Sequence, residues 1–213
     1  MNRNIIVAVT GASGALYARR LIQLLADAKR HVHVVFSPYG KRLFAEELGI
    51  HGITVQSIVG RPCEWITLHP HNDIGSVIAS GSYRTDGMVI CPCSANTFGA
   101  VASGMGDNLI HRAAQVTLKE ARRLVLVYRE MPMSQIDLKN ALTLSQAGAI
   151  VCPANPGFYM MPQSVDDIVD FVVGKILDLL NVDHDLNTRW QQPAAAGRIA
   201  NGAAGEPTPA AKR

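Results

Sequence analysis

The chain has 213 residues, of which 48% are apolar and 17% are charged. This length suits one α/β domain, and this composition can bury a core, so wholesale disorder is excluded. The net charge of +3 is too small for the basic surface that nucleic-acid binding requires, and four cysteines are too few for a disulfide scaffold.

The apolar segments of the chain do not predict export or a membrane span. The N-terminal run Ile5–Val9 is too short for a signal peptide. Gly87–Gly106 and Asn140–Val165 contain no charged residue, but prolines and polar residues interrupt both. We therefore expect a cytoplasmic globular protein in which these two segments form buried walls and loops, suited to an apolar or aromatic ligand.

Strand and helix patterns alternate along the chain. In chain order they predict the strand Ile5–Val9, the helix Ala15–Ala28, the strand Val32–Phe36, the helix Tyr39–Leu48, the strand Met88–Cys91, the helix Asp107–Arg122, the strand Leu124–Tyr128, a helix from Ser134 to Gly148, the strand Ala149–Cys152 and the helix Asp166–Leu180. Ser134 with Asp137, and Ser164 with Asp167, are typical of capping boxes. The segment His51–Ser76 has no clear period and receives no assignment.

Apolar strands that alternate with helices are typical of a parallel sheet covered on both faces. The predicted fold class is α/β: a doubly wound, mostly parallel sheet in a three-layer sandwich of the Rossmann or flavodoxin type. We expect a single domain over residues 1–190. In residues 191–213, 14 of 23 residues are Ala, Gly or Pro, which predicts a disordered tail.

The residues that follow each strand are the candidates for a site, because ligands bind beyond the carboxyl ends of the strands in such sheets. Gly11–Gly14 opens a helix, where free backbone N–H groups favour an anion; a turn without a ligand is the alternative. Ser37 follows the second strand, and Ser94–Thr97 follows the third. These positions are predicted to contact the phosphate or ring of a nucleotide.

A mononucleotide such as FMN fits this pattern better than a dinucleotide. Ser13 stands where the dinucleotide fingerprint has its second glycine. Ser37 stands where an acidic residue would hold the ribose hydroxyls. Both departures disfavour a nicotinamide-dependent reductase.

Arg129 and Glu130 directly follow the fourth strand. An arginine binds phosphate oxygens and a glutamate can hold a proton for a leaving group, so this pair suits phosphate chemistry. An ordinary surface ion pair is the alternative. Lys119 adds positive charge shortly before the same strand.

The cysteines and histidines form no standard zinc motif. Cys91 and Cys93 lack the usual two-residue gap, and His69 and His71 lie with Cys63 in the unassigned segment. We therefore predict no metal site. The cysteines on strands are expected to be small core residues rather than nucleophiles.

Eight short motifs occur in order along the chain, at Thr10–Gly14, Ala79–Ser82, Met88–Ser94, Asn108–Ala114, Leu118–Glu120, Leu124–Pro132, Pro156–Tyr159 and Pro162–Ser164. This ordered set resembles the UbiX-like flavin prenyltransferase family, within the flavin-dependent cysteine decarboxylase superfamily. The resemblance runs from about residue 4 to Trp190. It is weakest between His51 and Ser76.

The resemblance implies a transferase that joins a dimethylallyl group from dimethylallyl phosphate to N5 and C6 of reduced FMN. The product, prenylated FMN, is the cofactor of UbiD-like decarboxylases. Such proteins need no metal and form homododecamers, with sites built from neighbouring subunits. The same cofactor, partners and assembly are therefore expected for this chain.

The resemblance also implies roles for individual residues. FMN would be held by Gly11, Ala12, Ser13, Ser37, Ser94, Ala95, Asn96, Thr97 and Arg129. The prenyl phosphate would be held by Lys119, Arg129, Glu130, Tyr159 and Lys175, the last in place of an expected arginine. Catalytic roles would fall to Glu130 as the proton donor to the phosphate, Trp190 beside the allylic cation, and Ser13 with Glu47 in proton relay at the flavin.

Two rival functions use the same fold. One is a flavin-dependent decarboxylase of a cysteine-containing substrate, which needs a histidine base near its flavin; no histidine follows Ser37 before His51. The other is a non-catalytic FMN-binding subunit of an aromatic-acid decarboxylase system. An assay of purified protein with reduced FMN and prenyl phosphate distinguishes all three.

Overall fold

A computed structural model describes residues 4–186 and residue 188. Trp190 and the predicted tail 191–213 lie outside these residues. Within the described chain, six strands form one sheet: β1 (Asn4–Val9), β2 (His31–Phe36), β3 (Ile66–His69), β4 (Gly87–Cys93), β5 (Arg123–Tyr128) and β6 (Ile150–Val151). Their order is β3-β2-β1-β4-β5-β6, and each recorded pairing is parallel. This is the Rossmann-type order, so the predicted fold class is confirmed.

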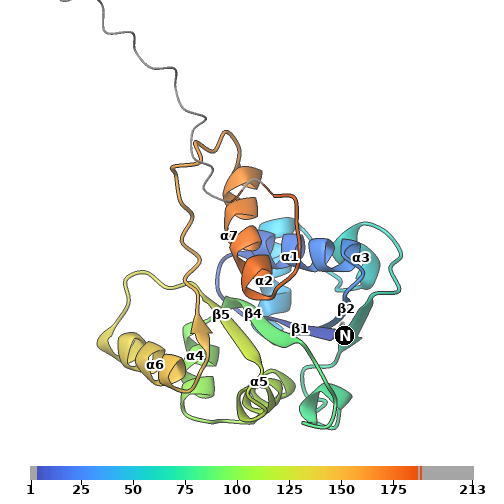
Figure 1. The fold of residues 1–213 in the computed structure, drawn as a ribbon. Coiled ribbons are helices and arrows are strands. Elements are labelled where there is room, and N and C mark those ends of the chain that lie inside the picture. Colours follow the sequence, from blue (N-terminus) through green and yellow to red (C-terminus); the bar gives the residue numbers. More distant parts are fainter. Residues whose placement is uncertain (1–3, 187, 189–213) are drawn as a thin grey trace, which may run out of the picture.

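Helices cover both faces of the sheet (Figure 1). One layer contains α1 (Ala15–Asp27), α2 (Pro38–Leu48), α3 (Val55–Val59) and α7 (Val165–Leu179). The other contains α4 (Ala95–Ala102), α5 (Leu109–Lys119) and α6 (Gln135–Gln146), beside a short 3-10 turn, η1 (Val77–Ala79). Within the described residues, no helix combines the length and apolar character that a membrane crossing requires.

The central strand β1 shows why the strands are continuous apolar runs. Ile5, Val7 and Val9 pack into the core under α1 and α7, whereas Ile6 and Ala8 pack into the core under α4 and α5. Successive side chains of a strand point to opposite faces, and here both faces are covered. A polar side chain at either set of positions would therefore be buried.

The predicted elements occur with small shifts at their ends, and both predicted capping boxes are present, at Ser134 and Ser164. Two elements that the sequence did not predict, helix α3 and strand β3, lie in the unassigned segment. Strand β3 raises the number of strands from the predicted five to six. Strand β3 is only partly buried because it lies at the edge of the sheet, so it lacks an apolar run. Helix α4 was also missed, because its eight residues carry no charge and show no polar face.

The strand order creates a crevice between β1 and β4. These strands pair with each other, but β1 leads into α1 on one face and β4 leads into α4 on the other. The loops beyond their carboxyl ends therefore separate, which is where open α/β sheets bind ligands.

Candidate functional site

A pocket of about 460 Å³ opens at this crevice. Most of the residues expected to hold the cofactor line it, namely Gly11, Ala12, Ser37, Ser94, Ala95, Asn96, Thr97 and Arg129, and Glu130 joins them. They come from four separate loops, after β1, β2, β4 and β5. The volume lies within the range of small-ligand and cofactor sites.

Hydrogen bonds from the Thr10 hydroxyl and from the backbone hold three of these loops together. The Thr10 hydroxyl donates to the Pro92 carbonyl (2.8 Å) and accepts from the Ser94 N–H (2.9 Å). The Ser37 N–H donates to the Val9 carbonyl at 2.9 Å. Thr10 is 1% exposed, so these bonds are shielded from water. Sequence analysis gave Thr10 no role, although its place directly after a buried strand was a usable signal.

Glycine permits close packing at the mouth of the pocket. A methyl group on Gly11 would overlap the Tyr39 side chain, and one on Gly40 would overlap the Val9 carbonyl. Any larger residue would push the β1 loop away from α2. The two glycines thus keep the loop and the helix start beside each other.

Two helix starts face the pocket. Ser37 caps α2, where its hydroxyl accepts from the Gly40 N–H at 3.0 Å, and Ser94 caps α4, where its hydroxyl accepts from the Thr97 N–H at 3.4 Å. Residues at both starts line the pocket. Backbone N–H groups and the positive ends of two helix dipoles therefore favour an anionic group such as a phosphate there.

The start of α1, by contrast, is occupied by a side chain of the protein itself. The Glu47 carboxylate accepts from the Gly14 N–H (3.1 Å) and from the Ala15 N–H (2.8 Å). The expectation that the whole Gly11–Gly14 turn offers free N–H groups to a ligand is therefore wrong at its C-terminal end. This cap holds Glu47 against Gly14, the residue that follows Ser13, but neither Ser13 nor Glu47 lines the pocket.

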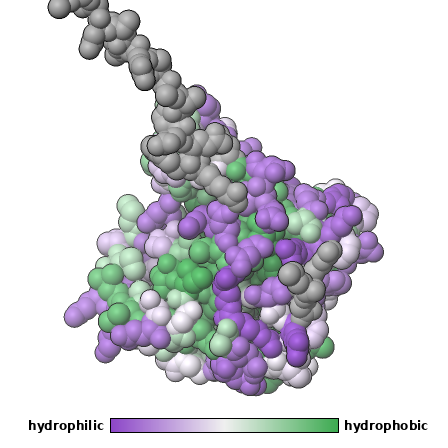
Figure 2. Space-filling view, viewed as in Figure 1, coloured by the Kyte–Doolittle hydropathy of each residue, from purple (hydrophilic) through white to green (hydrophobic). Residues whose placement is uncertain are grey.

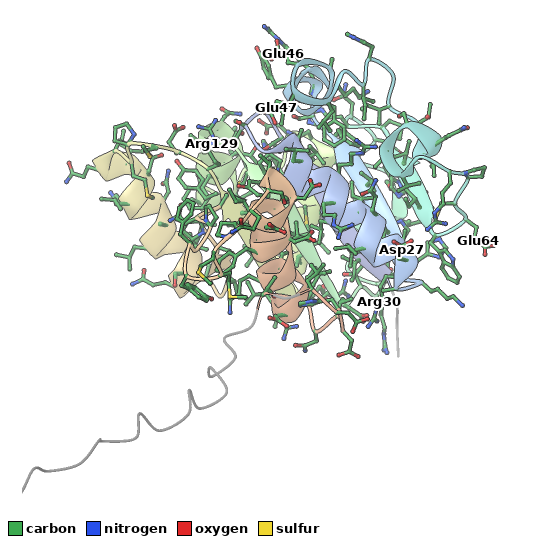
Figure 3. The ribbon with its side chains drawn as sticks, turned by 90° about the horizontal axis from the view of Figure 1, so that it is seen from above. Asp27, Arg30, Glu46, Glu47, Glu64 and Arg129 are labelled. Atoms are coloured by element: carbon green, nitrogen blue, oxygen red, sulfur yellow. The ribbon has the colours of Figure 1, made fainter. Side chains whose placement is uncertain are left out.

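Arg129 holds an unusual place in the pocket wall. Its backbone N–H donates to the Cys93 carbonyl at 3.3 Å, which fixes the residue at the end of β5. Its Nε atom is buried and has no hydrogen-bond partner among the described residues. A buried, unpaired guanidinium nitrogen is costly, so a ligand oxygen at this position would be favoured. Figure 3 shows Arg129 and Glu47 at the same edge of the molecule, opposite Asp27 and Arg30.

Three polar pocket residues were missed by sequence analysis: His71, Asn108 and His111. His71 lies in the segment without an assignment, and the two others open α5. Burial lowers the pKa of His111, Asp107 acts in the opposite direction, and the neighbouring His71 lowers it further. The sequence disfavoured a cysteine decarboxylase because no histidine base was expected near the flavin. The two histidines in the pocket weaken that argument.

Tyr159 and Lys175 do not line the pocket. The Tyr159 ring packs edge-on against Phe171 of α7, with ring centroids 5.6 Å apart. Lys175, also on α7, is exposed, and its charge acts on the thiol of Cys152, which follows β6.

Lys119 lies at the opposite end of β5 from Arg129 and Glu130, with which it was expected to bind the prenyl phosphate. It ends α5, directly before β5 begins, and its ammonium lies 3.4 Å from the Glu120 carboxylate. Arg129 and Glu130 follow the other end of β5. A six-residue strand spans roughly 20 Å, so the predicted convergence of Lys119 with Arg129 does not occur within one chain.

The residues considered as zinc ligands have other surroundings. His69 bonds to His33 (2.9 Å) and to Ser76 (2.8 Å), whereas His71 turns toward the pocket. Cys91 and Cys93 are fully buried, and burial raises the pKa of both thiols. Among residues 4–186 and 188, no group of three potential ligand side chains gathers as a metal site would require.

The Flavoprotein family model matches residues 1–177. The flavin prenyltransferase UbiX of Halalkalibacterium halodurans is 45% identical over 188 residues, which is 86% of this chain and 91% of the relative.

Two solved structures share both fold and sequence. AnUbiX (PadA1), in complex with FMN and dimethylallyl pyrophosphate, has a TM-score of 0.83 and 38% identity, covering 90% of this chain and 99% of that one. A dodecameric FMN-dependent UbiX-like decarboxylase from Escherichia coli O157:H7 has a TM-score of 0.81 and 39% identity, covering 89% of this chain and all of that one. A family model over most of the sequence and relatives this similar show that the chain belongs to the UbiX flavin prenyltransferases, within the Flavoprotein family.

Proposed function

We propose that this protein transfers a dimethylallyl group from dimethylallyl phosphate to N5 and C6 of reduced FMN. The observation that carries the proposal is the pocket between β1 and β4, where the unpaired Arg129 Nε lies beside Glu130. The similarity to AnUbiX, a protein seen with FMN and dimethylallyl pyrophosphate, supports this choice of substrates.

FMN would be bound by groups that the four loops present. The starts of α2 and α4, with Ser37 and Ser94–Thr97, suit its phosphate, and the backbone of Gly11 and Ala12 allows close approach. The Arg129 guanidinium suits an oxygen of the flavin or of the second substrate. Reduced FMN supplies the nucleophilic nitrogen that receives the prenyl group.

The remaining residues would serve the prenyl phosphate. The allylic C–O bond breaks while a C–N bond forms, so the phosphate leaves with the bonding electrons. Glu130 would give a proton to a phosphate oxygen, and Lys119, Tyr159 and Lys175 would bind its charge. Trp190 would face the allylic cation, and Ser13 with Glu47 would move protons at the flavin during ring closure.

We further propose that the protein works as a homo-oligomer, a dodecamer like the UbiX-like protein of E. coli. Hydrophobic surface gathers over α6 (Figure 2). Ile136, Leu138 and Leu142 on this helix are 72%, 57% and 59% exposed, which is typical of a surface covered by a partner. The product would pass in the cytoplasm to a UbiD-like decarboxylase, and no metal would take part.

The test uses purified protein, reduced FMN and dimethylallyl phosphate in EDTA-containing anaerobic buffer. The expected result is a flavin whose mass rises by one prenyl unit, with a matching change in its spectrum. An unmodified flavin that stays bound would indicate the non-catalytic subunit instead. A parallel incubation with oxidised FMN and a peptide ending in cysteine tests the decarboxylase: the peptide would lose carbon dioxide while its two electrons reduce the flavin.

A further inference from the structure

The loop between β5 and α6, residues 129–134, carries two charged residues of the pocket wall. Arg129 and Glu130 come first in this loop, and both line the pocket. The Glu130 side chain is exposed, and its carboxylate accepts from the Met131 N–H at 3.2 Å, a contact within the loop itself. The place of this carboxylate therefore depends on what holds the loop.

A side-chain hydrogen bond joins the two ends of the loop. Tyr128, the last residue of β5, donates from its hydroxyl to Oδ1 of Asp137 on α6 at 2.6 Å. The other carboxylate oxygen, Oδ2, accepts from the backbone N–H (2.8 Å) and the hydroxyl (2.6 Å) of Ser134, which caps α6. Asp137 thus binds the end of the strand and the start of the helix at the same time.

The Tyr128 side chain is itself held in place. Its ring is 2% exposed and stacks on Phe98 of α4, with ring centroids 4.1 Å apart. Burial raises the pKa of Tyr128 above its ordinary value, and the Asp137 carboxylate raises it further, so the hydroxyl stays a proton donor. The charge of Glu130 acts in the same direction, which places that carboxylate within electrostatic range of the hydroxyl.

We propose that Tyr128 is a positioning residue for prenyl transfer: its hydrogen bond to Asp137 fixes the loop so that the Glu130 carboxyl meets the phosphate of the prenyl donor. The inference rests on the proposed function, in which Glu130 gives a proton to that phosphate. Proton transfer needs the donor within hydrogen-bond distance of its acceptor, so a shift of the loop by about 1 Å would slow the step. Arg129 depends less on this bond, because its backbone N–H is fixed by the Cys93 carbonyl at 3.3 Å.

A purely structural role for Tyr128 has a different consequence. Loss of a buried hydrogen bond lowers the free energy of unfolding, whether or not a catalytic loop is attached to it. Tyr83 provides the matched case, because its hydroxyl bonds to the buried His33 at 2.8 Å and the residue does not line the pocket. Tyr83→Phe therefore removes a similar bond and leaves the loop after β5 as it is.

Single-turnover prenylation of bound, reduced FMN by dimethylallyl phosphate tests the inference, because a rate per bound flavin does not change when part of the protein is unfolded. We expect Tyr128→Phe to bind FMN within about threefold of the wild type but to transfer the prenyl group about tenfold more slowly. Tyr83→Phe should lower Tm and keep the wild-type rate. A wild-type rate in Tyr128→Phe, or an equal loss of rate in Tyr83→Phe, would overturn the inference.

A double-mutant cycle with Asp137→Ala shows whether the two side chains act through their shared bond. If they do, the protein with both Tyr128→Phe and Asp137→Ala should be no slower than Asp137→Ala alone. Independent effects would instead multiply, to a loss of about a hundredfold if each variant loses about tenfold. Multiplied losses would contradict the inference.

Hydrogen exchange of the loop amides tests the restraint without any reaction. The N–H groups of Met131 and Ser134 both donate to carboxylates at this loop, so peptides covering residues 129–134 should exchange about tenfold faster in Tyr128→Phe. Tyr83→Phe should exchange there like the wild type. Unchanged exchange in Tyr128→Phe, with an active wild type, would overturn this inference alone. A wild type that binds FMN without prenylating it would overturn the proposed function and the part of Tyr128 in it, whatever the exchange.

Discussion

At the scale of single residues, Arg129 gives the clearest sign of a ligand site. Its buried Nε has no hydrogen-bond partner in the described chain, and a ligand oxygen would supply the missing acceptor. We expect Arg129→Gln to weaken FMN binding by about 10- to 100-fold, the cost of one hydrogen bond to a charged group. Quenching of flavin fluorescence measures this affinity. Arg61→Gln, which alters an exposed arginine paired with Asp27, is the control; equal affinities for both variants would remove Arg129 from the site.

His33 is a residue whose burial makes stability depend on pH. Its ring bonds to Tyr83 (2.8 Å) and His69 (2.9 Å), and burial together with its histidine neighbours lowers its pKa to about 4. The unfolded chain binds this proton near pH 6.5, so the stabilising contribution of neutral His33 is present above that pH and is lost as the pH falls toward 4.

Denaturant titration at two pH values measures this loss. We expect the free energy of unfolding to fall by about 2 kcal/mol from this residue between pH 7 and pH 5. His33→Asn should show a smaller fall, and His51→Gln should match the wild type. A pH dependence that is the same in all three proteins would contradict the assignment.

At the scale of elements, the start of α1 depends on a residue from another helix. Gly14 has no side chain to cap α1, and Glu47 of α2 supplies the acceptor. We expect Glu47→Ala to cost about 1 kcal/mol and to lower Tm by about 2–4 °C, through the lost cap and the lost charge at the helix dipole.

Glu47→Gln separates this structural role from the proposed proton relay. The amide oxygen can still accept from the backbone, so we expect most of the stability to remain. The relay needs a group that accepts and releases protons, so flavin prenylated at N5 should accumulate without ring closure. Thermal melts and product spectra measure the two effects, and complete ring closure in a stable Glu47→Gln protein would leave Glu47 only its capping role.

The elements also show where prediction from sequence succeeds. The buried strands and the two capping boxes were predictable because their signals lie within a few residues of each other. Strand β3 and helix α4 were not: the first is a half-buried edge, and the second is a short helix without a polar face. Both became recognisable only through the neighbours they pack against.

At the scale of the whole molecule, one chain does not bring its expected substrate-binding residues together. Lys119 lies at the amino end of β5 and Glu130 beyond its carboxyl end. Tyr159 packs against Phe171 of α7, and Lys175 lies on the same helix. If all of them bind one phosphate, a second chain must supply Lys119, and this requirement agrees with the exposed apolar face of α6.

Mixed oligomers test this division of the site. We expect Lys119→Ala and Glu130→Gln each to lose most prenyl transfer. In particles co-assembled from the two variants, a shared site keeps both groups when one chain supplies Lys119 and the other supplies Glu130. Random assembly gives this combination in about a quarter of the sites, so about a quarter of the wild-type rate should return. Product formation per FMN bound is the measurement. Co-assembled particles without activity would show that the two residues do not serve a shared site.

By itself, the sequence determined the α/β alternation, the strand-end loops and the choice of a mononucleotide over a dinucleotide, because these signals depend on neighbouring residues. Most of the expected cofactor residues line one pocket for the same reason, since each follows a strand directly. Only the tertiary structure decided that Glu47 closes the start of α1, that His71 from an edge-strand loop reaches the pocket, and that Lys119 lies at the opposite edge. These facts follow from strand order, strand length and contacts between distant segments, and no local pattern contains them.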